Sequence, residues 1–210
     1  GPRARLVAIL GENLISDQAV GLIELVKNAY DADATHVQVS LLGLASPDTT
    51  IIEIRDDGCG MSIEDVQLRW LSPAVDHKER AKKAHLRSPG GRVPIGEKGV
   101  GRFAVQQIAK RLEMVTRSAG QSEVVVQIDW DPFESGYEYL DDMRFPVTER
   151  DPVEFKGDAT GTLLRMCGAR GPWTEKHVAK IHRTLRRLQS PVRPDSLDYK
   201  FEVRLMCPDH

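Results

Sequence analysis

Two glycine-rich turns, separated by a long polar stretch, constrain this chain more than any other feature. The first turn covers residues 56–61 and reads Asp-Asp-Gly-Cys-Gly-Met. The second covers residues 96–101, reads Gly-Glu-Lys-Gly-Val-Gly, and leads into a predicted helix over residues 100–111. Backbone N–H groups at such a helix start can face phosphates, and the helix dipole favours negative charge there. The second turn therefore predicts a phosphate cradle.

A helix is also predicted over residues 17–30, ahead of both turns. Asp17 is a suitable N-cap, and an apolar stripe follows it at helical spacing. Glu24, Asn28 and Asp31 stand at i, i+4 and i+7, so they share a different face of the helix. Taken alone, such residues would usually form a solvated face. Their place before the two turns makes them candidates for a polar site.

The rest of the pattern predicts short strands and further helices. Alternation and β-branched residues predict strands over residues 36–42, 50–55, 112–118, 123–130, 136–140 and 161–166. Ser62 is a candidate cap for a short helix, and residues 174–189 predict a basic helix. Because helices and strands do not alternate as βαβ units, the sequence predicts an α+β fold. The expected form is a two-layer sandwich of a mixed β-sheet and helices.

Composition limits the class of protein. With 40% hydrophobic residues, the chain can bury the core of one domain, expected over residues 3–210. The formal net charge of -2 gives no general basic field for nucleic acid. No apolar run is long enough to span a bilayer, and three irregularly spaced cysteines indicate no metal site or disulfide framework. We expect a cytoplasmic fragment of a longer protein, with residues 1–2 as a tag remnant.

Residues 73–94 are unusually polar for a segment inside a compact domain. They hold many charged side chains and few large apolar ones, and Pro-Gly-Gly comes late in the stretch. A segment of this kind is either disordered or a functional lid. Composition alone leaves both interpretations open, and we take a lid over residues 73–94 as the expectation.

Residues 24–34, 56–61 and 96–101 together resemble the N box and the two glycine boxes of the GHKL superfamily. That superfamily includes gyrase B, the ninety-kilodalton heat-shock chaperone, MutL, MORC proteins and sensor histidine kinases. The sequence Asn-Ala-Tyr-Asp, with a further aspartate after it, most resembles that of MORC-like and uncharacterised prokaryotic chaperone-like ATPases. The resemblance implies a Bergerat-type fold that binds ATP and Mg²⁺.

The resemblance also implies roles for the polar helix residues. Glu24 corresponds to the general base that polarises the attacking water, and Asn28 to the residue that gives an oxygen to Mg²⁺. Asp31 is placed with the nucleotide-binding residues. Histidine kinases usually carry asparagine at the position of Glu24, so the glutamate favours hydrolysis over phosphoryl transfer to histidine.

Asp56 corresponds to the aspartate that accepts a hydrogen bond from the exocyclic amine of adenine. Thr162, in a late Thr-Gly-Thr sequence, corresponds to the threonine that joins this aspartate through water. The other residues that the resemblance places at the nucleotide are Gly58, Gly60, Met61, Gly96, Lys98, Gly99, Val100 and Gly101.

Other readings of the glycine-rich turns fit less well. A P-loop would need Gly-Lys-Ser/Thr, which does not follow the second turn. Residues 99–104 match the GxGxxA of a Rossmann fold, but a polar stretch and not a βαβ strand precedes them. Two functional alternatives stay open. One is a histidine-kinase-type phosphotransferase, and the other is a nucleotide-gated binding module with negligible turnover.

In the resembled superfamily, ATP closes the lid and dimerises the domain, and hydrolysis resets a clamp. We therefore expect a slow ATPase that forms a nucleotide-dependent homodimer. The clamp can hold DNA or a client protein, and either partner is expected to bind through regions outside this chain. No membrane partner is expected. The basic helix over residues 174–189 is interpreted as a solvated face.

Overall fold

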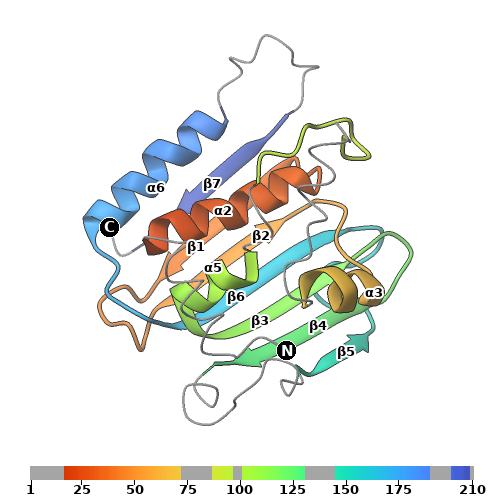
Figure 1. Cartoon of the computed structure of the whole chain (residues 1–210), viewed down its shortest axis with the longest axis horizontal. Coiled ribbons are helices and arrows are strands. Elements are labelled where there is room, and N and C mark those ends of the chain that lie inside the picture. Colours follow the sequence, from red (N-terminus) through yellow and green to blue (C-terminus); the bar gives the residue numbers. More distant parts are fainter. Residues whose placement is uncertain (1–16, 72–86, 97–100, 131–144, 190–199, 209–210) are drawn as a thin grey trace.

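The structure is a computed structural model that describes residues 17–71, 87–96, 101–130, 145–189 and 200–208. Within them, one sheet forms a layer and helices cover one of its faces (Figure 1). The helical segments are α2 (Gln18–Asp31), α3 (Ile63–Asp65), the π-helical turn η1 (Val66–Trp70), α5 (Gly101–Ile108) and α6 (Glu175–Leu188). The strands are β1 (His36–Leu42), β2 (Ile51–Asp56), β3 (Ala109–Arg117), β4 (Glu123–Asp129), β5 (Val147–Arg150), β6 (Gly161–Ala169) and β7 (Glu202–Met206).

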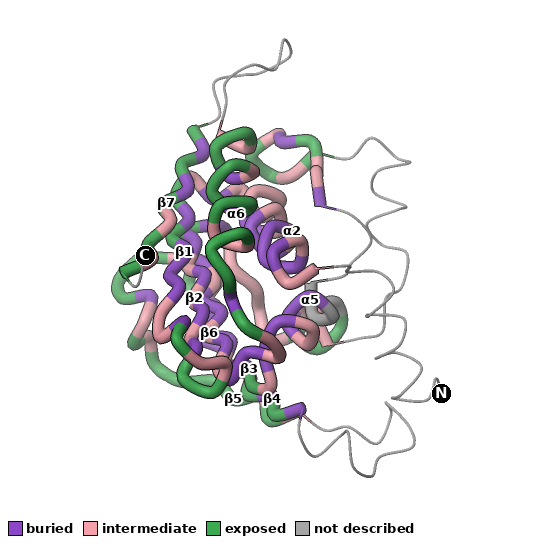
Figure 2. Tube along the Cα trace, turned by 90° about the vertical axis from the view of Figure 1, so that its left-hand side faces the viewer, coloured by how far each residue is buried: buried purple, intermediate pink, exposed green. Residues whose placement is uncertain are grey.

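The sheet is mixed. Its seven strands lie in the order β5-β4-β3-β6-β2-β1-β7. Neighbouring strands pair antiparallel, except that β7 runs parallel to β1 at one edge. Figure 2 shows the helical layer beside the sheet, with most buried residues between the two. The predicted two-layer α+β sandwich is confirmed.

Burial of its apolar stripe fixes α2 across the sheet. Leu22 and Val26 are fully buried in the core that also contains Val39 of β1 and Ile54 of β2. Burying each such side chain contributes roughly 1.5–3 kcal/mol. The predicted N-cap is present, because the Asp17 carboxylate accepts a hydrogen bond of 2.8 Å from the Ala19 amide. The buried stripe sets which residues α2 turns away from the sheet.

Several predicted boundaries differ from the structure. The helix expected over 100–111 ends at Ile108, and β3 begins at the next residue. The sheet explains this early change, because Ala109 pairs with Ala169 of β6 and the Lys110 carbonyl accepts from the Trp130 amide. The edge strands β5 and β7 were not predicted. The strand expected over 136–140 lies outside the described residues.

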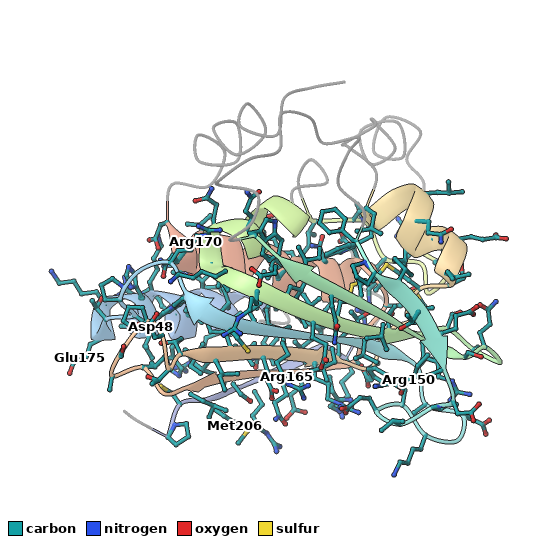
Figure 3. The ribbon with its side chains drawn as sticks, turned by 90° about the horizontal axis from the view of Figure 1, so that it is seen from below. Asp48, Arg150, Arg165, Arg170, Glu175 and Met206 are labelled. Carbon is teal, nitrogen blue, oxygen red and sulfur yellow. The ribbon has the colours of Figure 1, made fainter. Side chains whose placement is uncertain are left out.

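The sheet face opposite the helices is covered by ion pairs. Arg165 of β6 bonds to Glu53 of β2 at 2.6 Å and to Glu113 of β3 at 2.5 Å. Figure 3 shows Arg165 and Arg150 on this side of the sheet, away from the helices. Such pairs across adjacent strands stabilise a sheet face that water reaches.

A small hollow of about 380 Å³ opens on the same face, and its lining includes His36, Arg55, Phe155 and Arg204. The guanidinium group of Arg55, which lines the hollow, bonds to Glu154 at 2.9 Å and lies 4.7 Å from the centre of the Phe155 ring. The positive charge of Arg55 is therefore already paired within the protein. The lining also includes Asp56, Asp57 and Thr160, but none of the polar residues of α2.

Candidate functional site

The polar face of α2 carries the predicted general base. Glu24 is half-buried, and its Oε1 accepts a hydrogen bond of 2.6 Å from Nζ of Lys27. Asn28, also half-buried, follows one helical turn later on the same face. The lysine bond, at i+3, orients the Glu24 carboxylate. Lys27 was not among the residues singled out from the sequence, although its spacing from Glu24 could have indicated it.

The C-terminal end of α2 holds the start of the second glycine-rich turn. Asp31 accepts hydrogen bonds from the backbone amides of Ile95, at 2.8 Å, and Gly96, at 3.1 Å. Asp31 therefore lies within direct reach of the backbone that enters the expected phosphate cradle. In this structure its carboxylate positions that backbone.

The segment 87–96 is fastened to the loop after α2, and Figure 1 shows it in yellow-green beside that end of the helix. Asp33, with a left-handed φ of 61°, accepts from the Ser88 hydroxyl and from the Gly90 amide at 2.8 Å. Aspartate tolerates this φ better than most residues. These bonds fix the C-terminal part of the expected lid, whereas residues 72–86 lie outside the described residues.

Arg92 makes the central contacts between this segment and the C-terminal end of α2. Its side chain is buried, and its guanidinium donates to the carbonyl oxygens of Ala34, at 2.7 Å, and Tyr30, at 3.2 Å. It also lies 4.7 Å from the centre of the Tyr30 ring and donates to the Lys200 carbonyl at 3.2 Å. A buried cation of this kind is costly unless its donors are satisfied. Nothing in the sequence pattern indicated this residue.

Asp56, the predicted adenine reader, ends β2 with its side chain directed toward the helical layer. Its Oδ1 accepts from the amides of Gly58, at 2.9 Å, and Thr162, at 3.2 Å. No further hydrogen bond to this carboxylate is found among the described residues. Burial raises the pKa of Asp56 to about 6, against the opposing effect of the two amide bonds.

The adjacent carboxylate behaves in the opposite way. Asp57 accepts from the amides of Thr35 and His36, each at 2.7 Å, and from the Thr35 hydroxyl at 2.6 Å. Burial works to raise its pKa, but these hydrogen bonds lower the pKa of Asp57 to about 2. Asp57 therefore ties the end of β2 to the start of β1, and Asp56 is left to face the site.

A buried hydroxyl network supports the Asp56 turn. Oγ1 of Thr116 lies 3.0 Å from each of Oγ1 of Thr162, the Met61 amide and the Gly161 carbonyl. Thr116 is completely buried. It was not predicted from the sequence, because threonine is common in strands and its position gave no distinct signal. The network joins β3, β6 and the first glycine-rich turn.

Gly60 permits the turn to approach β3 closely. Its φ is 62°, and an added Cβ would lie 1.9 Å from the Arg117 carbonyl oxygen. At Gly58, an added Cβ would lie 2.7 Å from the Ala32 carbonyl oxygen. A side chain at Gly60 would clash with the β3 backbone, and one at Gly58 would also approach the Asp56 carboxylate, so the glycines keep the turn compact.

Hydrogen bonds join the described members of the predicted site in two groups. Asp31 lies with Gly96, and Asp56 lies with Gly58 and Thr162. The described members lie on α2, the first turn, the start of β6 and the entry to the second turn. Gly101 begins α5. Lys98, Gly99 and Val100 lie outside the described residues. Among the described residues there is no group of three metal-binding side chains, and no helix is long and apolar enough to cross a membrane.

Comparison with known proteins agrees with this geometry. The family described as histidine kinase-, DNA gyrase B-, and HSP90-like ATPase matches residues 16–162, more than half of the chain. The chain therefore belongs to this family of ATPases. The fold of a mixed sheet covered on one face by helices is consistent with the Bergerat fold of that family. The predicted membership of the GHKL superfamily is confirmed.

Individual relatives are similar over about half of the chain. A putative type II restriction enzyme, HgiDII of Herpetosiphon aurantiacus, is 36% identical over 111 residues, which are 53% of this chain and 16% of the relative. The DNA mismatch repair protein MutL of Beijerinckia indica subsp. indica is 31% identical over 117 residues, which are 54% of this chain and 17% of the relative. The similarity therefore spans less than a fifth of these two longer proteins.

Gly60→Ala should destabilise the domain more than Gly120→Ala. Both glycines have a left-handed φ, of 62° and 72°, so alanine costs roughly 1–2 kcal/mol at either position. At Gly120 an added Cβ meets nothing within 4 Å, whereas at Gly60 it meets backbone and should cost about 1–3 kcal/mol more. Urea unfolding of both variants measures the difference. Equal losses would show that the close approach at Gly60 is unimportant.

Proposed function

We propose that this domain binds ATP with Mg²⁺ and hydrolyses ATP, and that ATP binding drives its dimerisation as part of a clamp. The observation that carries the proposal is the Asp56 carboxylate. It is buried, two backbone amides hold one of its oxygens, and it ends a strand beneath the helical layer. Family membership supports the same function.

In the proposed complex, Asp56 accepts a hydrogen bond from the exocyclic amine of adenine through its second oxygen. Guanine has a carbonyl oxygen at the equivalent position, so the carboxylate would favour adenine. Thr162 and Gly58 support this role because their amides hold the other carboxylate oxygen in place. At Gly60 the turn packs directly against the Arg117 backbone, which keeps the turn beside Asp56 compact.

Glu24 is proposed as the general base. Its carboxylate would orient a water for attack on the γ-phosphorus and accept the water's proton as the bond to the ADP oxygen breaks. The bond from Lys27 supports this role by limiting the orientations of the carboxylate. Asn28, one turn away, would supply an oxygen to Mg²⁺, which suits a hard cation that prefers oxygen ligands. Bound Mg²⁺ would neutralise charge on the phosphates.

The amides from Gly96 to Gly101 are proposed to cradle the phosphates, with Lys98 as an additional contact. Asp31 accepts from the Gly96 amide itself, at 3.1 Å, and would thereby position the amides that follow for the phosphates. Because Ser88, Gly90 and Arg92 are fastened to the loop after α2, the proposed moving lid is confined to residues 73–86. The fastened segment would act as its fixed base.

A link to DNA is the proposed context of the clamp. Of the relatives described above, one is named a putative restriction enzyme and the other a DNA mismatch repair protein. Both names denote proteins that act on DNA, so we favour DNA over a client protein as the partner of the clamp. The whole parent protein's activity is part of this proposal.

Affinity for ATP should fall as the pH drops through about 6. The pKa of Asp56 is raised to about 6, so the carboxyl group is protonated below that value and ionised above it. If only the ionised form binds adenine, Kd should rise about tenfold between pH 7 and pH 5. Calorimetric titration with excess Mg²⁺ measures this. Asp56→Asn should remove binding at every pH in a folded domain, and a pH-independent wild-type affinity would contradict the assignment.

Glu24→Ala should keep ATP binding and reduce turnover by about 10²–10⁴-fold, because the base acts only on the attacking water. Asn28→Ala should instead weaken the Mg²⁺-dependent part of ATP binding. Glu149→Ala, which removes an exposed carboxylate from β5, is the control and should change neither quantity. Phosphate release and calorimetry give the two readouts. An equal loss of binding and turnover in Glu24→Ala would make Glu24 a structural residue.

A non-hydrolysable ATP analogue with Mg²⁺ should dimerise the domain and protect residues 73–86 from hydrogen exchange. The many charges of this segment would gain a shared anion on which to close. Residues 88–92 should be protected to a similar extent in both states, because their bonds to the α2 loop need no nucleotide. Sedimentation and peptide-level exchange test both parts. A monomer at saturating analogue would refute dimerisation by this chain alone.

A further inference from the structure

The outward face of α6 concentrates positive charge. This 14-residue helix carries five cations and one carboxylate, whereas the whole chain has a formal net charge of -2. Figure 2 shows most of the helix surface as exposed. The five cations, all exposed, are Lys176, Lys180, Arg183, Arg186 and Arg187. The remainder of the chain therefore has a negative formal net charge.

Four of these five cations differ from most others in the described chain because they lack a partner among the described residues. Only Lys180 is paired, with Asp17 at 2.7 Å. The other four make no hydrogen bond or ion pair within the described residues. On the sheet, by contrast, Arg55, Arg150 and Arg165 each pair with a carboxylate. Outside α6, the described cations that likewise lack a partner are Arg111 and Lys156.

Packing keeps these side chains pointing outward together. Ile181 and Leu185 of α6 are buried, and the helix packs against α2 on that side. Lys176, Lys180, Arg183 and Arg187 stand at i, i+4, i+7 and i+11, which is one continuous stripe of the opposite face. At 1.5 Å per residue the stripe is about 16 Å long. Phosphates on one DNA strand follow one another at about 3.4 Å along the axis, so the stripe spans several.

We propose that this outward face of α6 binds the phosphate backbone of duplex DNA. The stripe exposes no large apolar side chain, whereas protein interfaces have an apolar or aromatic centre. A membrane-surface helix would need a free apolar face, and that of α6 is buried. The stripe also lacks aromatic side chains on which single-stranded bases could stack. A regular polyanion is the partner that fits.

The surface lies apart from the nucleotide site. In the helical layer α2 contacts both α5 and α6, and Figure 1 shows α2 between them. DNA on α6 would therefore leave Asp56 and the glycine-rich turns open. This proposal goes beyond the proposed ATPase function, and it places a DNA contact within this chain. Because binding is measured without nucleotide, its failure is distinguishable from a failure of ATP binding.

The experiment compares two triple variants of the full 210-residue chain with the wild type on a fluorescent DNA duplex. One variant combines Lys176→Ala, Arg183→Ala and Arg187→Ala on α6. The matched control combines Arg111→Ala, Lys156→Ala and Arg204→Ala, which removes the same charge from exposed positions elsewhere. The α6 variant should bind on the order of tenfold or more weakly at low salt, and its log–log salt slope should fall by about three. The control should keep most of the wild-type affinity and slope.

Thermal unfolding monitored by circular dichroism checks that both variants fold. A charge-preserving variant, Arg183→Lys with Arg187→Lys, should retain DNA binding. It is the control that separates loss of charge from loss of structure in the alanine variant. Equal slopes for the two triple variants would overturn the proposal, as would a wild type that does not bind duplex DNA at low salt. Tighter binding to duplex RNA, or to phosphatidylserine vesicles, would overturn the choice of DNA.

Discussion

The buried guanidinium of Arg92 is the interaction on which the arrangement of the site depends. A cation removed from water is tolerated only where carbonyl oxygens and aromatic faces replace its hydration. The C-terminal end of α2 supplies both, through the carbonyls of Tyr30 and Ala34 and the Tyr30 ring. Once Arg92 is held there, the chain that follows must pass beside Asp31, whose carboxylate takes the amides of Ile95 and Gly96. The entry to the second glycine-rich turn is thereby placed next to the helix that carries the proposed base.

The first glycine-rich turn uses two neighbouring carboxylates in different ways. Asp57 accepts several hydrogen bonds at the surface, which stabilise its charge and connect β1 with β2. Asp56 is buried and has only two amide donors, so its charge is less well compensated. A further donor from a ligand would improve that balance. The turn thus separates a structural aspartate from one suited to recognition.

The surface of the domain likewise combines charges that are paired within the protein and charges that are not. On the open face of the sheet, Arg165 bridges Glu53 and Glu113, so the surface is polar and internally compensated. On α6, Arg183 and Arg187 have no such partners within the described chain. A formal net charge of -2 hides this contrast, because it averages a paired surface with an unpaired one. Surface pairing, and not composition, distinguishes the two faces.

The sequence by itself determined much of this protein. Helical spacing placed Glu24 and Asn28 on one face of α2, and the order of the glycine-rich turns indicated the superfamily. These features are local, so a single segment carries each signal. The long helices and the central strands were predicted for the same reason, apart from their boundaries.

Only the tertiary structure decided the rest. Ala109 starts a strand because β6 offers it a partner, and Thr116 gains its role from Thr162 and Met61, which are distant in sequence. Arg92 is one of many basic residues until the end of α2 surrounds it with carbonyl oxygens. Such roles depend on donors, acceptors and buried surface contributed by remote segments. Spacing along one segment determines which face a residue occupies, whereas folding alone determines what that residue meets there.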